Sequence, residues 1–251
     1  MLLTSRNVLI TGASSGIGLA LCRQLVANGA TVFPTGRRQI TDLAGYIPAD
    51  LSQQAGRDHL TGHLEQETDH IDVAIYNAGT LGSPQVALRD YEERTWRSVL
   101  ELNVTAIQLL HQRLDSLLTA SGHPTVIVTS SSVGRQGRAG WGAYSVAKHA
   151  IEGWAAILAD EWGGVGRVYS VNPGGTATPM RAAAFPDEDQ DSLPTGDDIA
   201  PVFLYLSRED CPAPTGTRLN ARDWIGLDPQ NGLQIVQSNG MVTPSKHGEI
   251  P

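Results

Sequence analysis

A glycine-rich turn between a short apolar strand and a helix constrains this chain more than any other feature. Residues 7–10 predict the strand, and residues 17–28 carry apolar side chains at helical spacing and stop at Gly29. The turn reads TGASSGIG over residues 11–18. Glycine here permits a tight turn and a close approach of the backbone to a pyrophosphate, while the helix N-terminus offers free N–H groups. The motif therefore predicts a dinucleotide site, although three glycines outside this context usually mark an ordinary turn.

The alternation of strand and helix continues along most of the chain. Further strands are predicted at residues 31–35, 45–47, 72–76, 125–129 and 167–171, separated by segments with helical periodicity. Repeated βα units imply an α/β fold of the Rossmann type, doubly wound, with a parallel sheet covered by helices on both faces. No linker or composition change divides residues 1–223, so we expect one domain there. Residues 224–251 contain four glycines and three prolines without a clear period, which predicts a C-terminal extension or tail whose role the residues do not indicate.

The composition excludes several other classes of protein. A chain of 251 residues with 41% apolar and 18% charged residues is long and apolar enough to bury a sizeable core. The net charge of −8 provides no basic surface, so we expect no nucleic-acid partner. The apolar runs are too short to cross a bilayer, which excludes a membrane protein. The two cysteines, Cys22 and Cys211, and the absence of a signal segment predict a reduced, cytoplasmic location.

The end of the second strand predicts which cofactor the site takes. An NAD site usually places a carboxylate here to bind the ribose 2′-hydroxyl, but this chain has Gly36 followed by Arg37 and Arg38. A guanidinium can pair with a 2′-phosphate, so we expect NADP(H) rather than NAD(H), with Arg37 favoured over Arg38. The alternative is that both arginines are surface charges. Asp50 has two interpretations that stay open: it accepts from the adenine amine, or it caps a helix that begins near Ser52.

A tyrosine and a lysine lie four residues apart in a segment with helical periodicity, residues 143–162. This spacing puts the Tyr144 phenol and the Lys148 ammonium on one helix face. A fixed cation stabilises a phenolate, so we expect the pKa of Tyr144 to move from about 10 toward working pH and the phenol to act as an acid and base. The spacing is also frequent by chance, and the pair alone favours a structural role.

A serine near the end of the strand at residues 125–129 is a candidate for binding substrate. Ser131 lies thirteen residues before Tyr144, where parallel sheets place their binding crevice. Its hydroxyl can hold a substrate oxygen. Ser130 and Ser132 compete for that role, and a merely polar strand end is the alternative; the spacing to the tyrosine favours Ser131.

Together these motifs resemble the short-chain dehydrogenase/reductase family over about residues 5–220. The resemblance rests on TGASSGIG, on YNAG at residues 76–79 in place of the usual NNAG, on Asn103, Ser131, Tyr144 and Lys148, and on NPG at residues 172–174. It implies a Rossmann-type fold with a seven-stranded sheet and nicotinamide-dependent carbonyl or alcohol chemistry. By the family's pattern Tyr144 is the acid/base and Lys148 holds the nicotinamide ribose and lowers the tyrosine pKa. Ser131 orients the substrate carbonyl, and Asn103 supports the lysine through a water-linked proton relay.

The resemblance also implies the wall of the cofactor site. Asn77, Ala78 and Gly79 border the adenosine ribose, and either Thr176 or Thr178 meets the nicotinamide carboxamide. The full expected set of cofactor contacts is Gly12, Ser14, Ser15, Gly16, Ile17, Gly18, Arg37, Arg38, Asp50, Leu51, Asn77, Ala78, Gly79, Asn103, Tyr144, Lys148, Pro173, Gly174, Thr176 and Thr178. Residues 130–138, 173–176 and 180–186 are similar to a bacterial subgroup of poorly characterised oxidoreductases. The chain departs from the family where the usual Asp-Gly-Gly after residue 216 is absent.

Other polar clusters favour simpler interpretations. His59 and His63 have the spacing of two metal ligands on a helix, but no third ligand is apparent, so no metal is expected. The acidic run Asp187, Glu188, Asp189 and Asp191 is predicted to be a solvated face, and near a site mouth it would disfavour anionic substrates. Trp141, three residues before Tyr144, is the tryptophan expected to approach the substrate.

These observations predict an NADP(H)-preferring reductase or dehydrogenase acting on a small-molecule carbonyl or secondary alcohol. Two alternatives remain: a dinucleotide-binding regulatory protein without turnover, and an epimerase or dehydratase on the same fold. The helices expected at residues 103–118 and 143–162 carry more apolar surface than one sheet face needs. By the family resemblance they pair across a two-fold axis, which predicts a homodimer or homotetramer.

Overall fold

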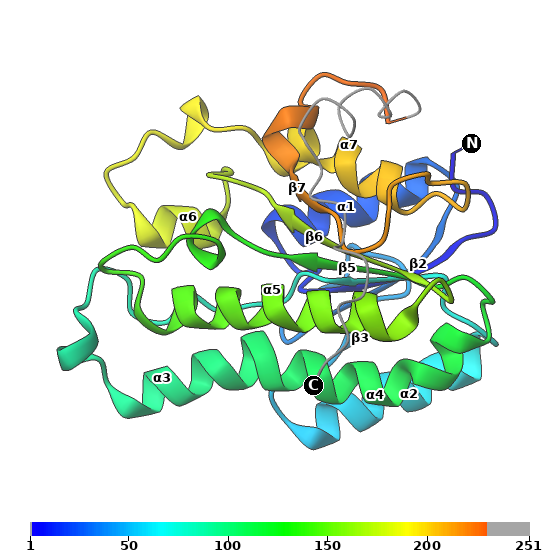
Figure 1. Cartoon of the computed structure of the whole chain (residues 1–251), viewed down its shortest axis with the longest axis horizontal. Helices are drawn as coiled ribbons and strands as arrows, with labels where there is room; N and C mark the ends of the chain where they lie inside the picture. The colour runs from blue at the N-terminus through cyan, green and yellow to red at the C-terminus, as the bar shows by residue number, and fades with distance from the viewer. Residues whose placement is uncertain (1, 230–251) are drawn as a thin grey trace, which may run out of the picture.

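A seven-stranded parallel sheet forms the centre of the protein, as the computed structural model shows for residues 2–229 (Figure 1). The strand order is β3-β2-β1-β4-β5-β6-β7, and every neighbouring pair is parallel. The central strands are apolar and buried on both faces, as a sheet covered by helices requires. The predicted fold class is confirmed. The strands are β1 (Asn7–Thr11), β2 (Thr31–Gly36), β3 (Ile47–Pro48), β4 (Val73–Tyr76), β5 (Thr125–Thr129), β6 (Arg167–Asn172) and β7 (Arg218–Asn220).

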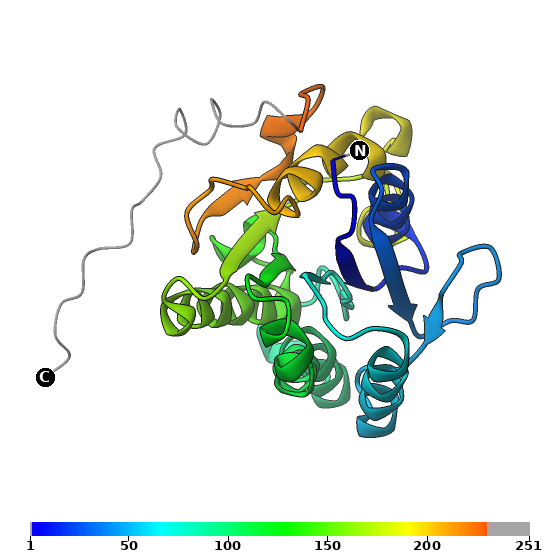
Figure 2. The ribbon, with the colours of Figure 1, turned by 90° about the vertical axis from the view of Figure 1, so that its right-hand side faces the viewer.

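Helices cover both faces of the sheet (Figure 2). On one face α1 (Gly16–Ala27) and α7 (Gly196–Leu206) bury their apolar sides against the strands, and on the other α2 (Gln54–Glu67), α4 (Ala106–Thr119) and α5 (Gly142–Trp162) do the same. The remaining elements are the helices α3 (Glu93–Leu100) and α6 (Pro179–Ala184), the π-helical turn η2 (Glu101–Thr105), and the 3-10 turns η1 (Leu88–Asp90), η3 (Ser132–Gly134), η4 (Gln190–Ser192) and η5 (Ala221–Trp224).

The strand order reverses beside β1, which creates the crevice where open α/β sheets bind ligands. The chain leaves β1 toward β2 on one side, and β4 pairs with β1 on the other. The Thr11 hydroxyl oxygen at the end of β1 accepts hydrogen bonds from the Asn77 and Ala78 backbone N–H groups, each at 3.0 Å. The ends of β1 and β4 are thereby fixed relative to each other at the mouth of the crevice.

The connection between β2 and β3 lacks a helix, which corrects the expectation that helical segments separate all the strands. Residues 37–46 form only bends and a turn. Leu43 and Tyr46 of this connection are partly buried and pack against the core cluster that contains α1 and α7. Two side chains therefore supply apolar cover where a helix would otherwise lie, because ten residues leave no room for a crossover helix.

The ordered core extends beyond residue 223. Trp224, predicted to be the first residue of the tail, is only 1% exposed, and its ring centroid lies 4.7 Å from that of Tyr205 in α7. The predicted boundary therefore assigns one core residue to the tail, because a lone tryptophan carries no periodic signal. Residues 230–251, the remainder of that predicted tail, lie outside the described residues.

Candidate active site

A cleft of about 1160 Å³ lies at the carboxyl ends of the strands and collects most of the predicted site residues. Gly18 and Asn103 are the two predicted residues that do not line it. The cleft-lining members of the predicted set are Gly12, Ser14, Ser15, Gly16, Ile17, Arg37, Arg38, Asp50, Leu51, Asn77, Ala78, Gly79, Ser131, Tyr144, Lys148, Pro173, Gly174, Thr176 and Thr178.

The glycine-rich turn has the shape that a bound pyrophosphate needs. Gly12 and Gly16 have φ values of +72° and +55°, in the left-handed region that favours glycine. A Cβ at Gly12 would lie 2.8 Å from the Ala78 Cα, and one at Gly16 would lie 3.0 Å from the Thr178 Cγ2. The Ser15 side chain makes no capping hydrogen bond at the start of α1, so the helix N-terminus keeps its N–H groups for an anion.

Gly18 lies behind the cleft wall. A Cβ there would collide with the Gly12 carbonyl oxygen, so the absence of a side chain lets α1 pack directly against the turn. The third glycine of the motif thus serves close packing, one of the functions that the motif predicts for its glycines.

The end of the cleft at Asp50 and Leu51, where we predict the adenosine, combines polar and apolar walls. The Asp50 Oδ1 accepts hydrogen bonds from the Ser52 backbone N–H at 3.1 Å and from the Ser52 hydroxyl at 2.7 Å. The helix α2 begins at Gln54 with Gln53 as its N-cap, so Asp50 shapes the turn before the helix without capping it. The Leu51 carbonyl accepts from the Arg57 Nη1 at 2.6 Å. Asp50 also lines the cleft, which is consistent with a contact to adenine. That contact stays a prediction.

The end of β2 presents two guanidinium groups and has glycine where NAD sites usually carry a carboxylate. Arg37 and Arg38 are exposed and line the cleft. A Cβ at Gly36 would lie 2.6 Å from the Tyr46 hydroxyl oxygen, closer than side chains normally approach. That hydroxyl donates a hydrogen bond to the Arg38 carbonyl at 2.7 Å, which fixes the backbone of the arginine turn. The Tyr46 hydroxyl therefore lies beside the position that a side chain at residue 36 would take, a feature that the sequence analysis missed because Tyr46 is ten residues away.

Ser131, Tyr144 and Lys148 meet at the other end of the cleft. Ser131 follows β5 and caps η3, while Tyr144 and Lys148 lie one turn apart on α5. The Lys148 Nζ donates to the Thr129 carbonyl at 2.6 Å and lies 5.5 Å from the centroid of the Tyr144 ring. A Cβ at Gly134 would lie 2.7 Å from the Lys148 Cβ, so glycine is what lets η3 approach α5 this closely.

Of the three consecutive serines, Ser130 has its hydroxyl committed elsewhere. The Ser130 Oγ donates to the Glu152 carboxylate at 2.5 Å, and the residue is buried. The Ser131 Oγ accepts a long hydrogen bond, 3.4 Å, from the Val133 N–H and also hydrogen-bonds with the Tyr144 phenol. Ser130, Ser131 and Ser132 all line the cleft that contains Tyr144, but the Ser130 hydroxyl is bound to Glu152.

Burial shifts the pKa values of both Tyr144 and Lys148. Desolvation raises the pKa of Tyr144 to about 12, and a hydrogen bond with Ser131 opposes the rise. This shift is opposite to the expected one, because the cost of burying a phenolate exceeds the effect of the neighbouring cation. Desolvation also lowers the pKa of Lys148 to about 8, while the negative charge of Glu152 opposes that fall.

Asn103 lies in the π-helical turn η2, where α3 passes into α4. Its Oδ1 accepts from the Thr80 N–H at 2.8 Å, and its Nδ2 donates to the Thr80 carbonyl at 2.9 Å. π-Helical turns occur frequently at functional sites because they redirect side chains. Here the turn lets Asn103 hold the loop after β4, and its predicted water-linked relay to Lys148 stays a prediction.

An aromatic wall borders the space in front of Tyr144. The Trp141 ring centroid lies 5.8 Å from those of Tyr144 and Phe185. The Arg181 guanidinium stacks 3.9 Å from the Phe185 ring centroid and forms two hydrogen bonds of 2.6 Å with Glu188. The predicted approach of Trp141 to the site therefore has a structural basis, since its ring lines the cleft.

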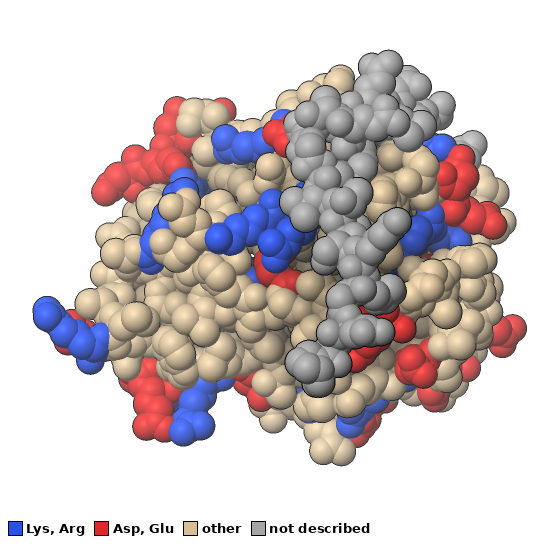
Figure 3. Space-filling view, in the orientation of Figure 1, with Lys and Arg blue, Asp and Glu red and all other residues tan. Residues whose placement is uncertain are grey.

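The acidic run after α6 is divided between two roles. Asp187, Asp189 and Asp191 are exposed. Acidic side chains gather at the upper left of Figure 3, on the side where Figure 1 shows α6. Glu188 instead pairs with Arg181, as described above, so one member of the run stabilises the wall of the site. The predicted solvated face holds for the three aspartates only.

The two histidines with the spacing of metal ligands do not line the cleft. His59 is exposed and His63 half-buried on α2, and residues 2–229 contain no group of three or more potential metal ligands. None of the described helices is long and apolar enough to cross a membrane.

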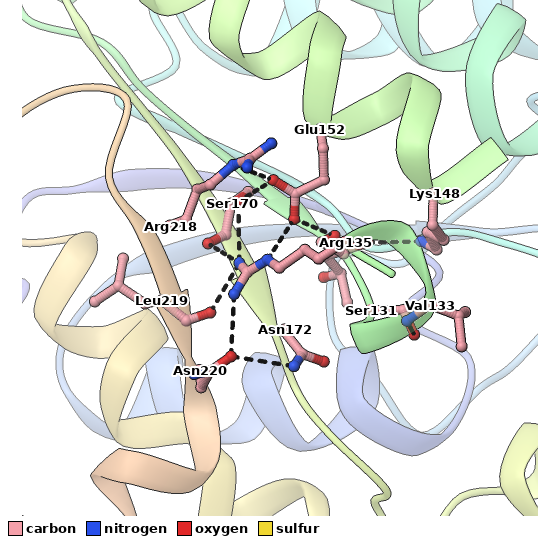
Figure 4. Close-up of polar contacts among 12 residues, drawn as sticks. Ser131, Val133, Arg135, Lys148, Glu152, Ser170, Asn172, Arg218, Leu219 and Asn220 are labelled. Carbon is pink, nitrogen blue, oxygen red and sulfur yellow. Dashed lines mark hydrogen bonds and ion pairs between the residues drawn. The ribbon is translucent and has the colours of Figure 1, made fainter. Parts of the chain in front are cut away.

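The buried carboxylate of Glu152 lies behind the site (Figure 4). The sequence analysis did not identify this residue. Glu152 lies on α5, one turn beyond Lys148, and is only 2% exposed. It contacts two serines and two arginines from other elements. Its spacing of four from Lys148 was a usable signal, but a glutamate at this spacing is equally common on exposed helix faces.

A Rossmann-type sheet with a glycine-rich turn and a Ser-Tyr-Lys group in one cleft defines a class of protein, the nucleotide-dependent oxidoreductases. The chain belongs to the short chain dehydrogenase family, whose model matches residues 6–189. It is therefore an NAD(P)-dependent oxidoreductase of this family.

Similar proteins match this chain over 88% of its length. The chain is 37% identical to the uncharacterised oxidoreductase YciK of Escherichia coli strain K12 over 238 residues, covering 88% of this chain and 93% of YciK. Among solved structures, a short-chain dehydrogenase from Shigella flexneri 2a complexed with NADP has a TM-score of 0.83 at 37% identity, covering 88% of this chain and 98% of that one. A short-chain dehydrogenase from Escherichia coli CFT073 complexed with NADPH has a TM-score of 0.83 at 36% identity, with the same coverage.

Proposed function

We propose that this protein is an NADP(H)-preferring oxidoreductase that interconverts a small-molecule carbonyl compound and its secondary alcohol. The observation that carries the proposal is the meeting of Ser131, Tyr144 and Lys148 at one end of a cleft whose other end holds Arg37 and Arg38. The cofactor preference is further supported by the two similar structures, which hold NADP and NADPH.

The chain's own residues supply proton transfer and orientation. The cofactor, when bound, supplies or takes the hydride. In the reductive direction the Ser131 hydroxyl holds the substrate oxygen, and Tyr144 donates its proton to that oxygen. The high pKa of Tyr144 keeps it protonated at neutral pH, which suits a proton donor. In the oxidative direction the Tyr144 oxygen, in its phenolate form, takes the proton from the alcohol.

Lys148 contributes a fixed charge and a binding group. Its Nζ is held by the Thr129 carbonyl, so the ammonium stays beside the tyrosine and the ribose end of the cleft. Its pKa of about 8 leaves it mostly charged near neutral pH. The aromatic wall of Trp141 and Phe185 restricts water and favours an apolar body on the substrate.

The test is an assay of absorbance at 340 nm with aldehydes, ketones and alcohols and with both cofactors. We expect turnover with NADPH that collapses in Tyr144→Phe while NADPH binding, measured by fluorescence, persists. Tyr205→Phe, which removes a hydroxyl from a buried ring of α7 outside the cleft, is the matched control and should retain turnover. Tight NADPH binding without turnover on the whole panel would favour the regulatory alternative, and near wild-type turnover by Tyr144→Phe in a chemistry-limited step would reject the acid/base assignment.

The proposal extends to assembly and location. We propose that the protein forms a homodimer or homotetramer through α4 and α5, and that it works in the cytoplasm without nucleic-acid partners. The exposed Ile157 and Val146 on α5 support the assembly.

A further inference from the structure

One buried carboxylate joins four separate elements immediately behind the candidate active site (Figure 4). The Glu152 Oε1 accepts from the Ser130 Oγ at 2.5 Å and from the Arg135 Nε at 2.9 Å. The Oε2 accepts from the Ser170 Oγ at 2.9 Å and pairs with the Arg218 Nε at 2.7 Å. The carboxylate therefore links α5 to the end of β5, to the segment after η3, to β6 and to β7.

The position of Glu152 relates this network directly to catalysis. Tyr144, Lys148 and Glu152 follow at intervals of four on α5, so they share one side of the helix. Ser130, which donates to Glu152, is bonded covalently to Ser131. A single hydrogen bond of 2.5 Å thus joins the helix that carries the acid/base to the backbone that carries the substrate-binding hydroxyl.

The network continues to the loop after β6, which contains Gly174. The Arg135 Nη1 donates to the Asn220 Oδ1 at 3.0 Å, and the Asn172 Nδ2 donates to the same oxygen at 3.1 Å. The Asn172 Oδ1 in turn accepts from the Gly174 N–H at 3.0 Å. Gly174 lines the cleft, so the two sides of the site share one set of polar contacts.

Fold stability alone does not account for a charged network in this place. A buried ion pair contributes little net stability, because the desolvation of both charges offsets their attraction. A fully hydrogen-bonded network does restrict side-chain and backbone positions, and an active site needs its groups held within a fraction of an ångström. The described hydrogen bonds occupy both oxygens of Glu152, so the group is fixed from all four sides.

We propose that Glu152 is a positioning residue that sets Ser131 against Tyr144 and Lys148 through Ser130, and that Arg135 transmits this alignment to the loop at Gly174. This inference rests on the proposed function of the site. Glu152 touches neither substrate nor cofactor, since it does not line the cleft. Its effect is on the rate of the chemical step.

The main test compares Glu152→Gln with a matched variant of another buried carboxylate. Glu152→Gln keeps the shape and removes the charge. Asp72→Asn does the same for a carboxylate that pairs with Arg6 at 3.1 Å and accepts from the Asn7 N–H at 2.7 Å, at the opposite end of the strands. For Glu152→Gln we expect the kcat with NADPH to be lower by about ten- to a hundredfold. The KM and the affinity for NADPH should change by less than about threefold. For Asp72→Asn we expect lower thermal stability and an unchanged kcat.

A second readout does not depend on activity. The Gly134 N–H donates to the Ser131 carbonyl at 2.9 Å, so its hydrogen exchange reports how firmly the Ser131 segment is held. We expect faster exchange there in Glu152→Gln and no change in Asp72→Asn. If Glu152→Gln does not fold, Ser130→Ala, which removes only the linking hydroxyl, should lower kcat by about threefold to tenfold and accelerate the same exchange.

The outcomes separate this inference from the proposed function. Absence of turnover in the wild-type protein overturns the proposed function, while the exchange measurement still tests the positioning. A wild-type kcat in Glu152→Gln, or in Ser130→Ala where that is the folded variant, overturns the positioning role. Unchanged exchange at Gly134 does the same, as does a loss of kcat in Asp72→Asn that matches the loss in Glu152→Gln.

Discussion

The proposed NADP(H) preference rests on the arginines at the end of β2, and the position of Tyr46 decides how a carboxylate introduced at residue 36 would change it. Introducing a carboxylate by Gly36→Asp is the usual way to favour NADH, since the acid binds the ribose 2′-hydroxyl and repels a 2′-phosphate. In this protein the new Cβ would lie 2.6 Å from the Tyr46 hydroxyl oxygen and 3.6 Å from the Ser14 Cβ. We therefore expect Gly36→Asp alone to weaken NADPH without improving NADH.

The magnitudes follow from the contacts involved. A charge-assisted contact from Arg37 to the 2′-phosphate is worth about 1.5 to 3 kcal/mol, which is about ten- to a hundredfold in affinity for NADPH over NADH. Moving Tyr46 aside breaks its 2.7 Å hydrogen bond to the Arg38 carbonyl, a loss of about 1 kcal/mol, and overpacking adds about 1 to 3 kcal/mol. These costs are large enough to cancel the gain from a new ribose contact.

Removing the obstructing hydroxyl should restore the switch. Tyr46→Phe keeps the ring against the core and removes the atom that the new Cβ would meet. We expect Tyr46→Phe alone to weaken NADPH by about fivefold, through loosening of the arginine turn. The triple change Gly36→Asp, Tyr46→Phe and Arg37→Ala should prefer NADH.

The assay is a fluorescence titration of NADPH and NADH into each variant, with thermal unfolding as the control for folding. Arg37→Ala should weaken NADPH much more than NADH, and Arg38→Ala identifies which guanidinium dominates. Equal affinities in the wild type, or tighter NADH, would show that the two arginines are surface charges. Full reversal by Gly36→Asp alone would refute the obstruction by Tyr46.

Three further predictions concern pH and assembly. Burial lowers the pKa of Lys148 to about 8 while Tyr144 stays protonated, so kcat/KM for reduction should fall as pH rises through about 8; a profile flat to pH 10 contradicts a role for the charge. Burial lowers the pKa of His111 to about 4 from an unfolded value of about 6.5, so the unfolded state binds the proton more readily between these values. The free energy of unfolding in urea should therefore fall by up to about 1.4 kcal/mol per unit as pH falls from 6.5 toward 4, and His111→Gln should flatten that slope. Ile157 and Val146 are 61% and 43% exposed on α5, so light scattering should detect a dimer or tetramer, and a monomer at micromolar concentration would reject the assembly.

Local sequence patterns determined the elements that depend on neighbours along the chain. The glycine-rich turn, the helix that follows it and the shared face of Tyr144 and Lys148 all follow from spacing within a few residues. The segment predicted as a helix at residues 143–162 agrees with α5 (Gly142–Trp162) for this reason. The short strand β7 (Arg218–Asn220) was not predicted from its residues, because three residues with a single apolar side chain carry no pattern.

The tertiary structure alone decided how distant segments act on one another. Tyr46 lies where a side chain at residue 36 would go, and Glu152 contacts Ser130. Both contacts exist because the fold brings separate elements together, and no local spacing encodes them. The pKa of Tyr144 moves upward for a related reason: the sequence places a cation nearby, but the depth of burial sets the solvation of the phenolate. The sequence by itself therefore determined which chemical groups the site contains. The packing of the whole chain decided their distances, their charges and the residues that hold them, since solvation and contact depend on all the elements at once.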